Sequence, residues 1–355
     1  MTAATMDIVM IDDGIAFDGR TPEEKPLGGA ESAFVSLAAA FAGRGHRVRA
    51  LTNGGRRLHH GGVEWGNLRD GAPERADLYI ANRGDRLLRL VPKALTTVFW
   101  IHNPAGYLRK WRYLSKLWRR QPILVFLGAF HAATHPSWLP PRRTAIIPHA
   151  VDDLFRKVVA PVTPPVPRAI FTSNPLRGLD WLLDLWTARV RPRLPTAELH
   201  VFSSAATYGA VGAAKAHLIT PVIEQARGLA GEGVVLRAAL PKAGLAAELA
   251  MSRVFLHPGT ADETYCFAAA EAQAAGVPAV VGAVGAMPER VRDGATGFVV
   301  ADVPGGGDAA YADRVVNILG DDETWRRLRD GALATQRARG WNEVAADFEA
   351  LCHGR

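Results

Sequence analysis

The stretch RVFLHPGTADETYCFAAAEAQAAGVPAVVGA, residues 253–283, contains a complete strand–loop–helix–strand unit. The apolar run that ends at Pro258 predicts a buried strand, and the run that follows Gly276 predicts a second one. Between them, the small residues from about Phe267 to Ala275 are typical of a tightly packed helix. Two strands joined through a helix are parallel neighbours in most sheets. The stretch therefore predicts an α/β fold.

The same alternation of strand-like and helix-like runs continues through both halves of the 355 residues, a length that fits two domains. The expected strands are 6–12, 46–52, 77–82, 96–102, 123–126, 168–173, 199–203, 234–239, 253–259, 278–283 and 297–300. This pattern predicts two doubly wound parallel sheets with helices on both faces. Four prolines between Pro161 and Pro167 indicate a linker, so we expect an N-terminal domain over 1–155 and a C-terminal domain over 156–335.

The composition excludes several classes of protein. No apolar run reaches the roughly 18 residues needed to cross a membrane. The first residues, MTAATMDIVMIDDG, lack the basic and apolar regions of a signal peptide. Cys266 and Cys352 lie far apart and form neither a disulfide framework nor a zinc motif. We therefore expect a cytoplasmic protein.

Positive charge is concentrated in one part of the chain. The net charge is +7, and the stretch 86–151 holds eleven Lys and Arg but no Asp or Glu. Such a run is typical of a surface that meets an anionic partner, although a solvated basic face explains it equally well. No nucleic-acid-binding motif accompanies it, so we expect no nucleic-acid partner.

In doubly wound sheets, ligands bind at the carboxyl ends of the strands, so the loops that follow the strands carry the candidate residues. These candidates are Gly28, Gly29, His102, Ser173, Asn174, Arg177, Lys242, Glu263 and Glu271. The helix start after Gly29 and the cations Arg177 and Lys242 suit a phosphate group. A plain turn at Gly29, a strand-end cap at His102 and an ordinary surface lysine at Lys242 remain alternatives.

A longer pattern in the second half is much more specific. Residues 258–300 contain, in order, E-x7-E, A-x-A-A-G-x-P, G-x-x-P-E and D-G-x-T-G-F. Together with GGAE at 28–31 and IIPHAVD at 146–152, they resemble the signature of the retaining GT-B glycosyltransferases of family 4. The resemblance implies two Rossmann-like domains that face a central cleft. It also implies that the final helix, within 336–355, crosses back to the N-terminal domain.

The resemblance assigns roles to individual residues. It implies that the N-terminal domain holds the acceptor and the C-terminal domain holds a nucleotide-activated sugar. Glu271 then binds the ribose and Glu263 the donor sugar, while His102 lies near the reacting centre. The diphosphate is expected against Gly28, Gly29, Ser173, Asn174, Arg177, Lys242 and the backbone of Tyr265, Cys266 and Phe267. We expect His102 and Glu263 to be the catalytic residues, and UDP to be favoured over GDP.

The sequence departs from the family where a Gly-Arg pair usually clamps the diphosphate, because Ser173 and Asn174 stand there. One clamp cation, Arg177, then remains unless Lys242 helps. The sequence has no D-x-D, the usual metal–diphosphate motif of the other large glycosyltransferase fold, so we expect no cofactor and no essential metal. We expect retention by front-face attack, in which a diphosphate oxygen takes the acceptor's proton.

The segment 107–120, YLRKWRYLSKLWRR, predicts an amphipathic basic helix. On a helical wheel, Tyr107, Leu108, Trp111, Leu114 and Trp118 share one arc, and Arg109, Arg112, Lys116, Arg119 and Arg120 share another. Such a helix can bind an anionic membrane surface, with a glycan or lipid-linked acceptor nearby. Packing of the apolar arc into the N-terminal domain, with the cations merely exposed, is the alternative.

Two other functions remain open at this point. A GT-B-fold sugar-nucleotide 2-epimerase is one, although the E-x7-E spacing with A-x-A-A-G-x-P speaks against it. A non-catalytic protein that binds a nucleotide or a glycan is the other, because the Gly-Arg pair is missing. The intact Glu263, Glu271 and His102 favour an enzyme that moves a sugar.

Overall fold

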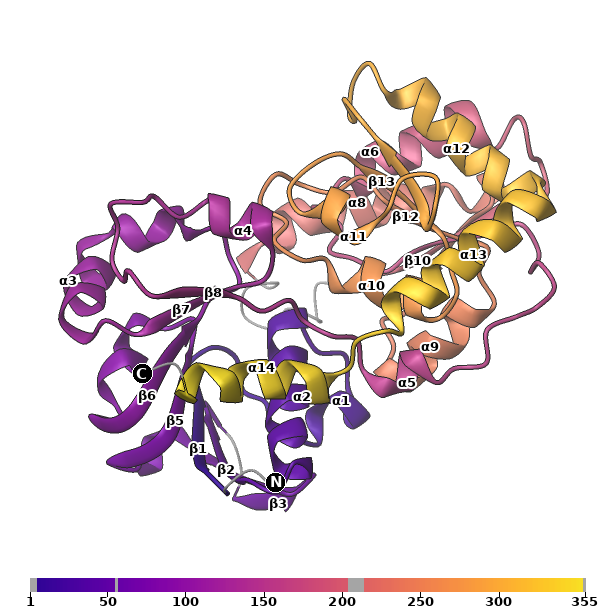
Figure 1. The fold of residues 1–355 in the computed structure, drawn as a ribbon. Helices are drawn as coiled ribbons and strands as arrows, with labels where there is room; N and C mark the ends of the chain where they lie inside the picture. Colours follow the sequence, from indigo (N-terminus) through magenta and orange to yellow (C-terminus); the bar gives the residue numbers. More distant parts are fainter. Residues whose placement is uncertain (1–4, 55–56, 204–213, 354–355) are drawn as a thin grey trace. The chain divides into compact units, whose positions relative to one another are not determined.

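The computed structural model describes residues 5–54, 57–203 and 214–353, and the chain divides into two compact units (Figure 1). Unit 1 comprises Met1–Glu24, Gly29–Ala150 and Arg339–Arg355. Unit 2 comprises Lys25–Gly28 and Val151–Ala338. Each unit is built around its own sheet and is described by itself.

Unit 1 contains an eight-stranded sheet. Its order is β3 (Leu58–His60), β4 (Val63–Asn67), β2 (Arg47–Thr52), β1 (Asp7–Asp12), β5 (Arg75–Asn82), β6 (Lys93–Trp100), β7 (Ile123–Phe126) and β8 (Thr144–Ile146). All neighbours are parallel except the β3–β4 pair. In the central register Met10 lies opposite both Ala50 and Ile80, and all three are fully buried. The short strands β3, β4 and β8 were not among the predicted strands.

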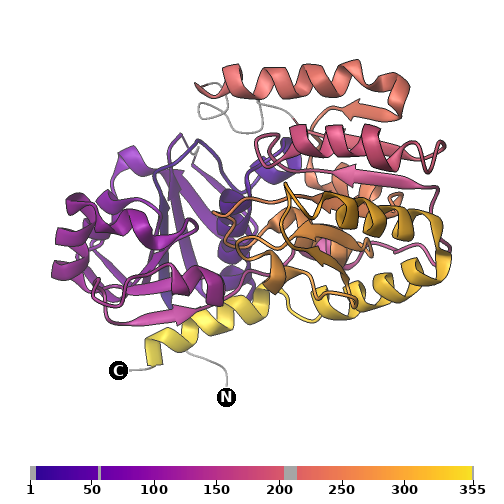
Figure 2. The same cartoon turned by 90° about the horizontal axis from the view of Figure 1, so that it is seen from above.

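The helices of unit 1 come from both ends of the sequence. They are α1 (Thr21–Glu24), α2 (Gly29–Gly43), α3 (Trp111–Arg120), α4 (Ala129–Ala133) and α14 (Trp341–His353). The C-terminal helix α14 packs along α2 and also contacts β5 and β6. Figures 1 and 2 both show this helix, in yellow, lying against unit 1. The last residues of the chain therefore complete the unit that the first residues begin.

The α2–α14 contact combines apolar packing with an ion-pair cluster. The rings of Phe41 and Phe348 meet edge to face at 6.3 Å between centroids. Glu349 on α14 accepts hydrogen bonds from Arg44 Nε at 2.5 Å and Arg44 Nη2 at 2.7 Å, and its Oε1 lies 3.0 Å from His46 Nε2. Because the carboxyl of Glu349 is only 9% exposed, these partners satisfy a nearly buried charge.

Unit 2 contains a six-stranded, fully parallel sheet. Its order is β11 (Val234–Arg237), β10 (Glu198–Phe202), β9 (Arg168–Phe171), β12 (Val254–His257), β13 (Ala279–Gly282) and β14 (Gly297–Val300). All six strands predicted for the second half are present. The apolar residues of the central strands β9, β12 and β13 are buried on both faces of the sheet, as expected for parallel strands covered by helices.

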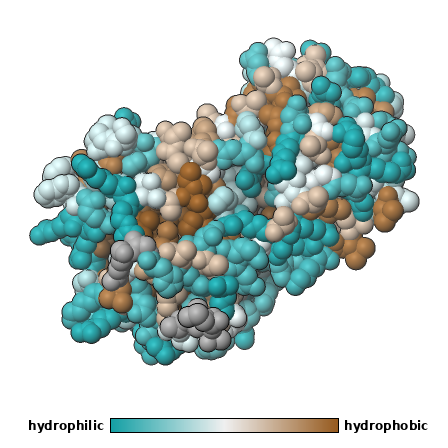
Figure 3. All heavy atoms as spheres, viewed as in Figure 1, coloured by the Kyte–Doolittle hydropathy of each residue, from teal (hydrophilic) through white to brown (hydrophobic). Residues whose placement is uncertain are grey.

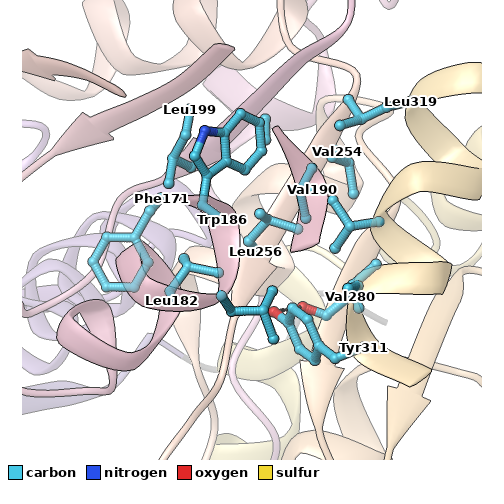
Figure 4. Close-up of a cluster of buried hydrophobic side chains, with 14 of the residues drawn as sticks. Phe171, Leu182, Trp186, Val190, Leu199, Val254, Leu256, Val280, Tyr311 and Leu319 are labelled. Atoms are coloured by element: carbon cyan, nitrogen blue, oxygen red, sulfur yellow. Dashed lines mark hydrogen bonds between the residues drawn. The ribbon is translucent and has the colours of Figure 1, made fainter. Parts of the chain in front are cut away.

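The helices of unit 2 cover both faces of its sheet. They are α5 (Asp153–Arg156), α6 (Leu179–Leu185), α8 (Ala216–Gly228), α9 (Lys242–Ala250), α10 (Phe267–Ala274), α11 (Met287–Arg290), α12 (Asp308–Gly320) and α13 (Asp322–Gln336). A π-helical turn, Trp186–Val190, extends α6. Figure 4 shows Trp186 and Val190 among the buried side chains of β9, β10, β12 and β13. Tyr311 of α12 donates a hydrogen bond to the Val280 carbonyl at 2.7 Å, which ties this helix to β13.

The two parallel α/β units confirm the predicted fold class. Among the parallel strands of each sheet the order reverses once, between β1 and β5 in unit 1 and between β9 and β12 in unit 2. Such reversal points are where open α/β sheets bind their ligands. Within the described residues, no helix is both long enough and apolar enough to cross a membrane.

Candidate functional site

In unit 2, the loop after β9 is fixed by short-range contacts. The side chain of Asn174 accepts a hydrogen bond from the Leu176 amide at 3.0 Å, and its carbonyl accepts one from the Arg177 amide at 3.0 Å. Gly178 then caps α6 with a positive φ of 86°. A Cβ on Gly178 would lie 2.8 Å from the Pro258 side chain, so only glycine lets this loop approach the loop after β12.

This close approach places Arg177 against Glu263. The guanidinium Nη1 of Arg177 donates to Glu263 Oε2 and also to Thr260 Oγ1, the latter at 3.1 Å. Burial raises the pKa of Glu263, but His257 and Arg177 outweigh it and hold that pKa below its ordinary value. The carboxylate is therefore ionised at neutral pH.

The backbone of Glu263 is held from the other side by the loop after β13. The Ala286 amide donates to the Glu263 carbonyl at 2.8 Å. Gly285 has a φ of 56°, and a Cβ there would lie 2.6 Å from the same carbonyl oxygen. The G-x-x-P-E turn seen in the sequence thus supports the first glutamate of E-x7-E.

Glu271, the second glutamate of E-x7-E, also forms an ion pair with a predicted phosphate-binding cation. Lys242, the first residue of α9, donates to Glu271 Oε1 on α10, and its ammonium lies 5.4 Å from the centre of the Phe155 ring. Burial dominates at Glu271 and raises its pKa, although Lys242 opposes the shift. Each of the two predicted donor-binding acids therefore faces one of the two predicted phosphate-binding cations.

The start of α10 has an unusual backbone. Cys266 is the N-cap residue and has a φ of 61°, in the left-handed region that glycine adopts more easily. Tyr265 and Cys266 are buried, and Phe267 is partly buried. The guanidinium of Arg290 lies 4.3 Å from the centre of the Tyr265 ring. The three residues predicted to offer amide groups thus lie at the start of this helix.

His257, at the end of β12, adjoins the same loop. Burial lowers its pKa, but the sulfur of Cys266 and the carboxylate of Glu263 outweigh this effect and raise the pKa of His257 to about 9. Its Nε2 lies 3.4 Å from Glu263 Oε2. His257 was not among the predicted site residues, although it lies within a predicted strand and ends β12.

In unit 1, a chain of hydrogen bonds leads to His102. Asn82, at the end of β5, donates from Nδ2 to Asp12 Oδ2 at 2.6 Å, and its Oδ1 lies 2.8 Å from His102 Nε2. Because Asn82 Oδ1 can only accept, His102 carries its proton on Nε2. Asp12 and Asn82 are fully buried. The orientation and tautomer of His102 are thus set by the carboxyl ends of β1 and β5.

Arg83 completes this cluster. It donates to Asp12 Oδ2 from Nη2 at 2.6 Å and to Glu31 Oε1 on α2 from Nη1 at 2.8 Å. Its φ of 69° is rare for a residue other than glycine. Sequence analysis did not select Asp12, Glu31, Asn82 or Arg83. Asp12, Asn82 and Arg83 end or follow strands β1 and β5, so the rule that selected the other loops would also have pointed to them.

His102 is surrounded by other rings. Its imidazole is stacked on that of His149, with 5.2 Å between centroids and 22° between planes, and Trp100 lies 4.8 Å away. Burial, followed by His149 and Arg83, lowers the pKa of His102 well below its ordinary value. At neutral pH His102 is therefore an uncharged hydrogen-bonding group and not a cation.

The basic segment differs from its prediction. The helix α3 begins at Trp111, and Leu108 lies in the preceding turn, fully buried in the unit 1 core. Tyr113 and Leu117 form the buried face of α3, whereas Trp111 and Trp118 are 76% and 75% exposed. The predicted apolar arc is therefore divided, because Tyr107, Leu108 and Leu114 pack against the core of unit 1, whereas both tryptophans lie in solvent.

Lys116 also differs from its prediction as an exposed cation. Its ammonium pairs with Asp85, and its side chain is only 13% exposed. The exposed cations around the two tryptophans are Arg109, Lys110, Arg112, Arg119 and Arg120. In Figure 3, the end of the molecule that carries α3 in Figure 1 shows pale and teal residues, so this surface is polar and not a continuous apolar patch.

The predicted donor residues are distributed unevenly. Unit 2 contains Gly28 and all the predicted donor residues from Ser173 onward, with Arg177 on Glu263 and Lys242 on Glu271. Unit 1 contains Gly29, which begins α2, and His102. The carbonyl of Ser173 accepts a hydrogen bond from Ser203 Oγ at 2.8 Å.

Comparison with known proteins gives a consistent result. Residues 167–321 match the family model described as "Glycosyl transferases group 1". A D-inositol 3-phosphate glycosyltransferase of Corynebacterium glutamicum (strain R) is 36% identical over 90 residues, which is 25% of this chain and 21% of that protein. The chain thus spans about a fifth of the length of this curated relative.

Solved structures extend the similarity to the whole fold. Sucrose-phosphate synthase from Thermosynechococcus elongatus superposes with a TM-score of 0.75 at 17% identity, covering 98% of each chain. HepE from Anabaena, solved in complex with UDP and glucose, has a TM-score of 0.72 at 16% identity, covering 99% of this chain and 100% of that one. The fold of this protein is therefore GT-B.

Proposed function

We propose that this protein is a retaining hexosyltransferase of glycosyltransferase family 4. It moves a sugar from a nucleotide-diphosphate donor, a UDP-sugar in preference to a GDP-sugar, to a hydroxyl of a glycan or lipid-linked acceptor. The observation that carries the proposal is the pair of acid–cation contacts, Arg177 with Glu263 and Lys242 with Glu271, beside the reversal point of the unit 2 sheet.

The two pairs suit the two ends of a sugar nucleotide. Glu271, within α10, accepts hydrogen bonds from the ribose hydroxyls, and Glu263, on the preceding loop, accepts them from the donor sugar. Arg177 and Lys242 lie beside these acids and neutralise the diphosphate as charge develops on it. The amides at the start of α10 add further donors. This arrangement stabilises the leaving group without a metal ion, and we propose that none is essential.

The acceptor half of the reaction falls to unit 1. His102 is neutral, and its Nδ1 is the nitrogen that can accept a hydrogen bond, because Nε2 carries the proton toward Asn82. A neutral imidazole can orient an acceptor hydroxyl without trapping its proton. The proton then goes to an oxygen of the departing diphosphate.

UDP in the HepE structure supports the choice of nucleotide.

The test is a thermal-shift screen of the whole protein with UDP, GDP, ADP and their sugars. We expect UDP and a UDP-sugar to raise Tm, because a ligand that binds only the folded state stabilises it by mass action. Glu271→Gln should abolish the UDP-dependent shift while keeping the shape of the side chain. An unchanged shift in Glu271→Gln would refute the ribose contact.

A matched control separates this effect from a general loss of stability. Glu224→Gln changes an exposed glutamate on α8 that pairs only with Arg227 among the described residues. This variant should keep the full UDP-dependent shift. If no nucleotide shifts the wild-type protein, the proposed function fails as a whole.

We also propose that the protein works in the cytoplasm, at the inner face of the membrane. The exposed Trp111 and Trp118 and the surrounding arginines of α3 form a surface that suits anionic headgroups. Lys116 is not part of this surface, since it pairs with Asp85. A lipid-linked acceptor would be reached from such a position.

A further inference from the structure

Three chemically different side chains meet at the end of β12 and on the loop that follows it. They are His257, Glu263 and Cys266, with residue exposures of 0%, 9% and 5%. One ring nitrogen of His257, one carboxylate oxygen of Glu263 and the sulfur of Cys266 all lie within 4.8 Å of one another. The loop from Pro258 to Tyr265 brings them together, although the first and last are nine positions apart.

The environment of His257 suggests that its side chain binds a ligand. It is fully buried, its Nε2 lies 3.4 Å from Glu263 Oε2, and neither ring nitrogen makes a hydrogen bond of ordinary geometry to a residue that the structure describes. Its imidazole lies between two rings, with centroid distances of 6.3 Å to Phe171 and 6.0 Å to Phe255. Leaving a buried polar group without a hydrogen bond costs about 1–3 kcal/mol, so such groups usually serve a purpose.

Cys266 is a second unusual feature of the same place. Its left-handed backbone conformation is one that residues other than glycine adopt at a cost on the order of 1–2 kcal/mol. Strain of this kind tends to occur where a side chain is needed in a particular position. At Cys266 the strain accompanies a thiol that lies within the cluster.

We propose that His257, Glu263 and Cys266 bind a single zinc ion, and that the protons displaced from the ligands are released to solvent, because zinc takes neutral imidazole and thiolate. Thiolate, imidazole and carboxylate are the ligands that Zn²⁺ takes in proteins, at about 2.3, 2.0–2.1 and 2.0–2.2 Å. Two such nitrogen and oxygen ligands at a tetrahedral angle are about 3.3 Å apart. The separation of His257 Nε2 and Glu263 Oε2 is 3.4 Å. Mg²⁺ and Ca²⁺ are disfavoured because they prefer oxygen ligands throughout.

The zinc ion would compete with Arg177. Both use Glu263 Oε2, so binding of the metal turns that oxygen away from the guanidinium. If the proposed function holds, the same carboxylate contacts the donor sugar, and zinc then inhibits transfer. This last consequence rests on the proposed function, whereas metal binding itself does not.

The test uses Co²⁺ as a spectroscopic substitute for Zn²⁺, with the full-length protein and no nucleotide. We expect a thiolate-to-cobalt charge-transfer band in the near ultraviolet that saturates at one equivalent, and Zn²⁺ should displace it. Cys266→Ser and His257→Gln should lose the band. Cys352→Ser is the matched control and should keep it, since Cys352 lies on α14 in unit 1.

Arg177→Gln provides a variant with the opposite effect. It removes the partner that shares Glu263 Oε2, so the affinity for Co²⁺ should rise.

A second measurement leaves the three proposed zinc ligands unchanged. In Cys352→Ser protein, Cys266 is the one remaining thiol. Zn²⁺ should slow its reaction with a thiol reagent, and a chelator should restore the rate.

The proposal is overturned if folded wild-type protein gives no band, or if the band survives in Cys266→Ser. It is also overturned if zinc leaves the thiol reaction unchanged, in which case His257 and Glu263 form only an imidazolium–carboxylate contact. A protein that binds Co²⁺ through Cys266 but shows no UDP-dependent thermal shift would refute the proposed function and leave the zinc site standing.

Discussion

His102 is oriented by a residue twenty positions earlier in the chain, Asn82, which is itself anchored on Asp12. Sequence analysis could place His102 at the end of a strand, but it could not name these partners. Asp12 and Asn82 meet because β1 and β5 are neighbours in the sheet, although seventy positions separate them. Strand order is a property of the whole unit, so local sequence patterns do not reveal it.

The state of His102 leads to a prediction about pH. Burial, together with His149 and Arg83, lowers its pKa, so the imidazole should remain neutral at pH 6.5 and below. The unfolded chain takes up this proton more readily, so protonation opposes folding as the pH falls below about 6.5. NMR of the ring nitrogens measures the titration directly. A His102 midpoint at or above about 6.5 would contradict this description.

The acid–cation pairs of unit 2 also could be predicted only in part from the sequence. The residues themselves follow from motif and position, since each lies in a loop or helix start after a predicted strand. That Arg177 would face Glu263, and Lys242 would face Glu271, depends on β9 and β12 being adjacent and on the close contact of Gly178 with Pro258. The sequence predicted which residues form the candidate site and not how they pair.

Among the elements, α3 is where a sequence pattern was misleading. A helical wheel assumed one continuous helix from Tyr107, but the chain turns before Trp111 and begins the helix in a different orientation. The buried face is consequently Tyr113 and Leu117, and the tryptophans are exposed. The predicted apolar face is thus only partly buried, since Leu108 and Leu114 contact the core and the two tryptophans do not.

The exposed face of α3 can be tested by charge reversal. Arg109→Glu, Arg112→Glu and Arg119→Glu together should weaken binding to vesicles of anionic phospholipid, since each nearby cation contributes about 1 kcal/mol. Co-sedimentation measures the binding, with vesicles of neutral lipid as the baseline. If binding to anionic vesicles is unchanged, membrane contact through α3 is refuted.

A second triple variant controls for the change in net charge. Reversal of Arg193, Arg227 and Arg326 alters three partly exposed cations of unit 2 by the same total amount. This protein should bind anionic vesicles as the wild type does. Equal losses in both variants would indicate a non-specific effect of charge.

The contact between α14 and α2 makes stability depend on pH. Burial raises the pKa of Glu349, but its hydrogen bonds with Arg44 and His46 outweigh this effect and lower it. A lowered carboxyl pKa contributes stability above the unfolded value of about 4.3, and this contribution is lost as the pH falls through the folded pKa. Glu349→Gln should therefore cost roughly 1–3 kcal/mol at pH 7 and less in acid.

Scanning calorimetry at pH 7 and at a pH well below the unfolded carboxyl value of about 4.3 checks this expectation. The Tm of Glu349→Gln should lie below that of the wild type at the higher pH, and the two values should approach each other at the lower pH. Glu224→Gln, on the surface of α8, should stay close to the wild type throughout. A constant difference at both pH values would show that Glu349 acts by packing alone.

At the scale of the whole molecule, the fold was the most predictable feature. All six strands of unit 2 lie where hydrophobic runs placed them, because each is long enough and regular enough to stand out. The strands that escaped prediction, among them β3 and β8, contain three residues each and cannot show a period. Short edge strands form because a neighbouring strand offers hydrogen bonds, and not because of their own sequence.

The stereochemistry of the product tests the complete reaction. Oε2 of Glu263 accepts a hydrogen bond from Arg177, and Glu271, on α10, accepts one from Lys242. The two glutamates therefore do not resemble the opposed carboxylate pair of a hydrolase. The proposed front-face attack predicts that the product keeps the anomeric configuration of the donor. The coupling constant of the anomeric proton, measured by NMR soon after mixing, decides it. An inverted anomer would refute front-face attack.

The position of α14 also has a consequence for how the protein is made. A ribosome releases the chain from its N-terminus, so all of unit 2 emerges while unit 1 still lacks the helix that covers Phe41 and His46. Until α14 is translated, Phe41 of α2 and the neighbouring His46 lack the helix that covers them. A nonsense mutation at the start of α14 should therefore be far more damaging to the nascent protein than the length of this helix suggests.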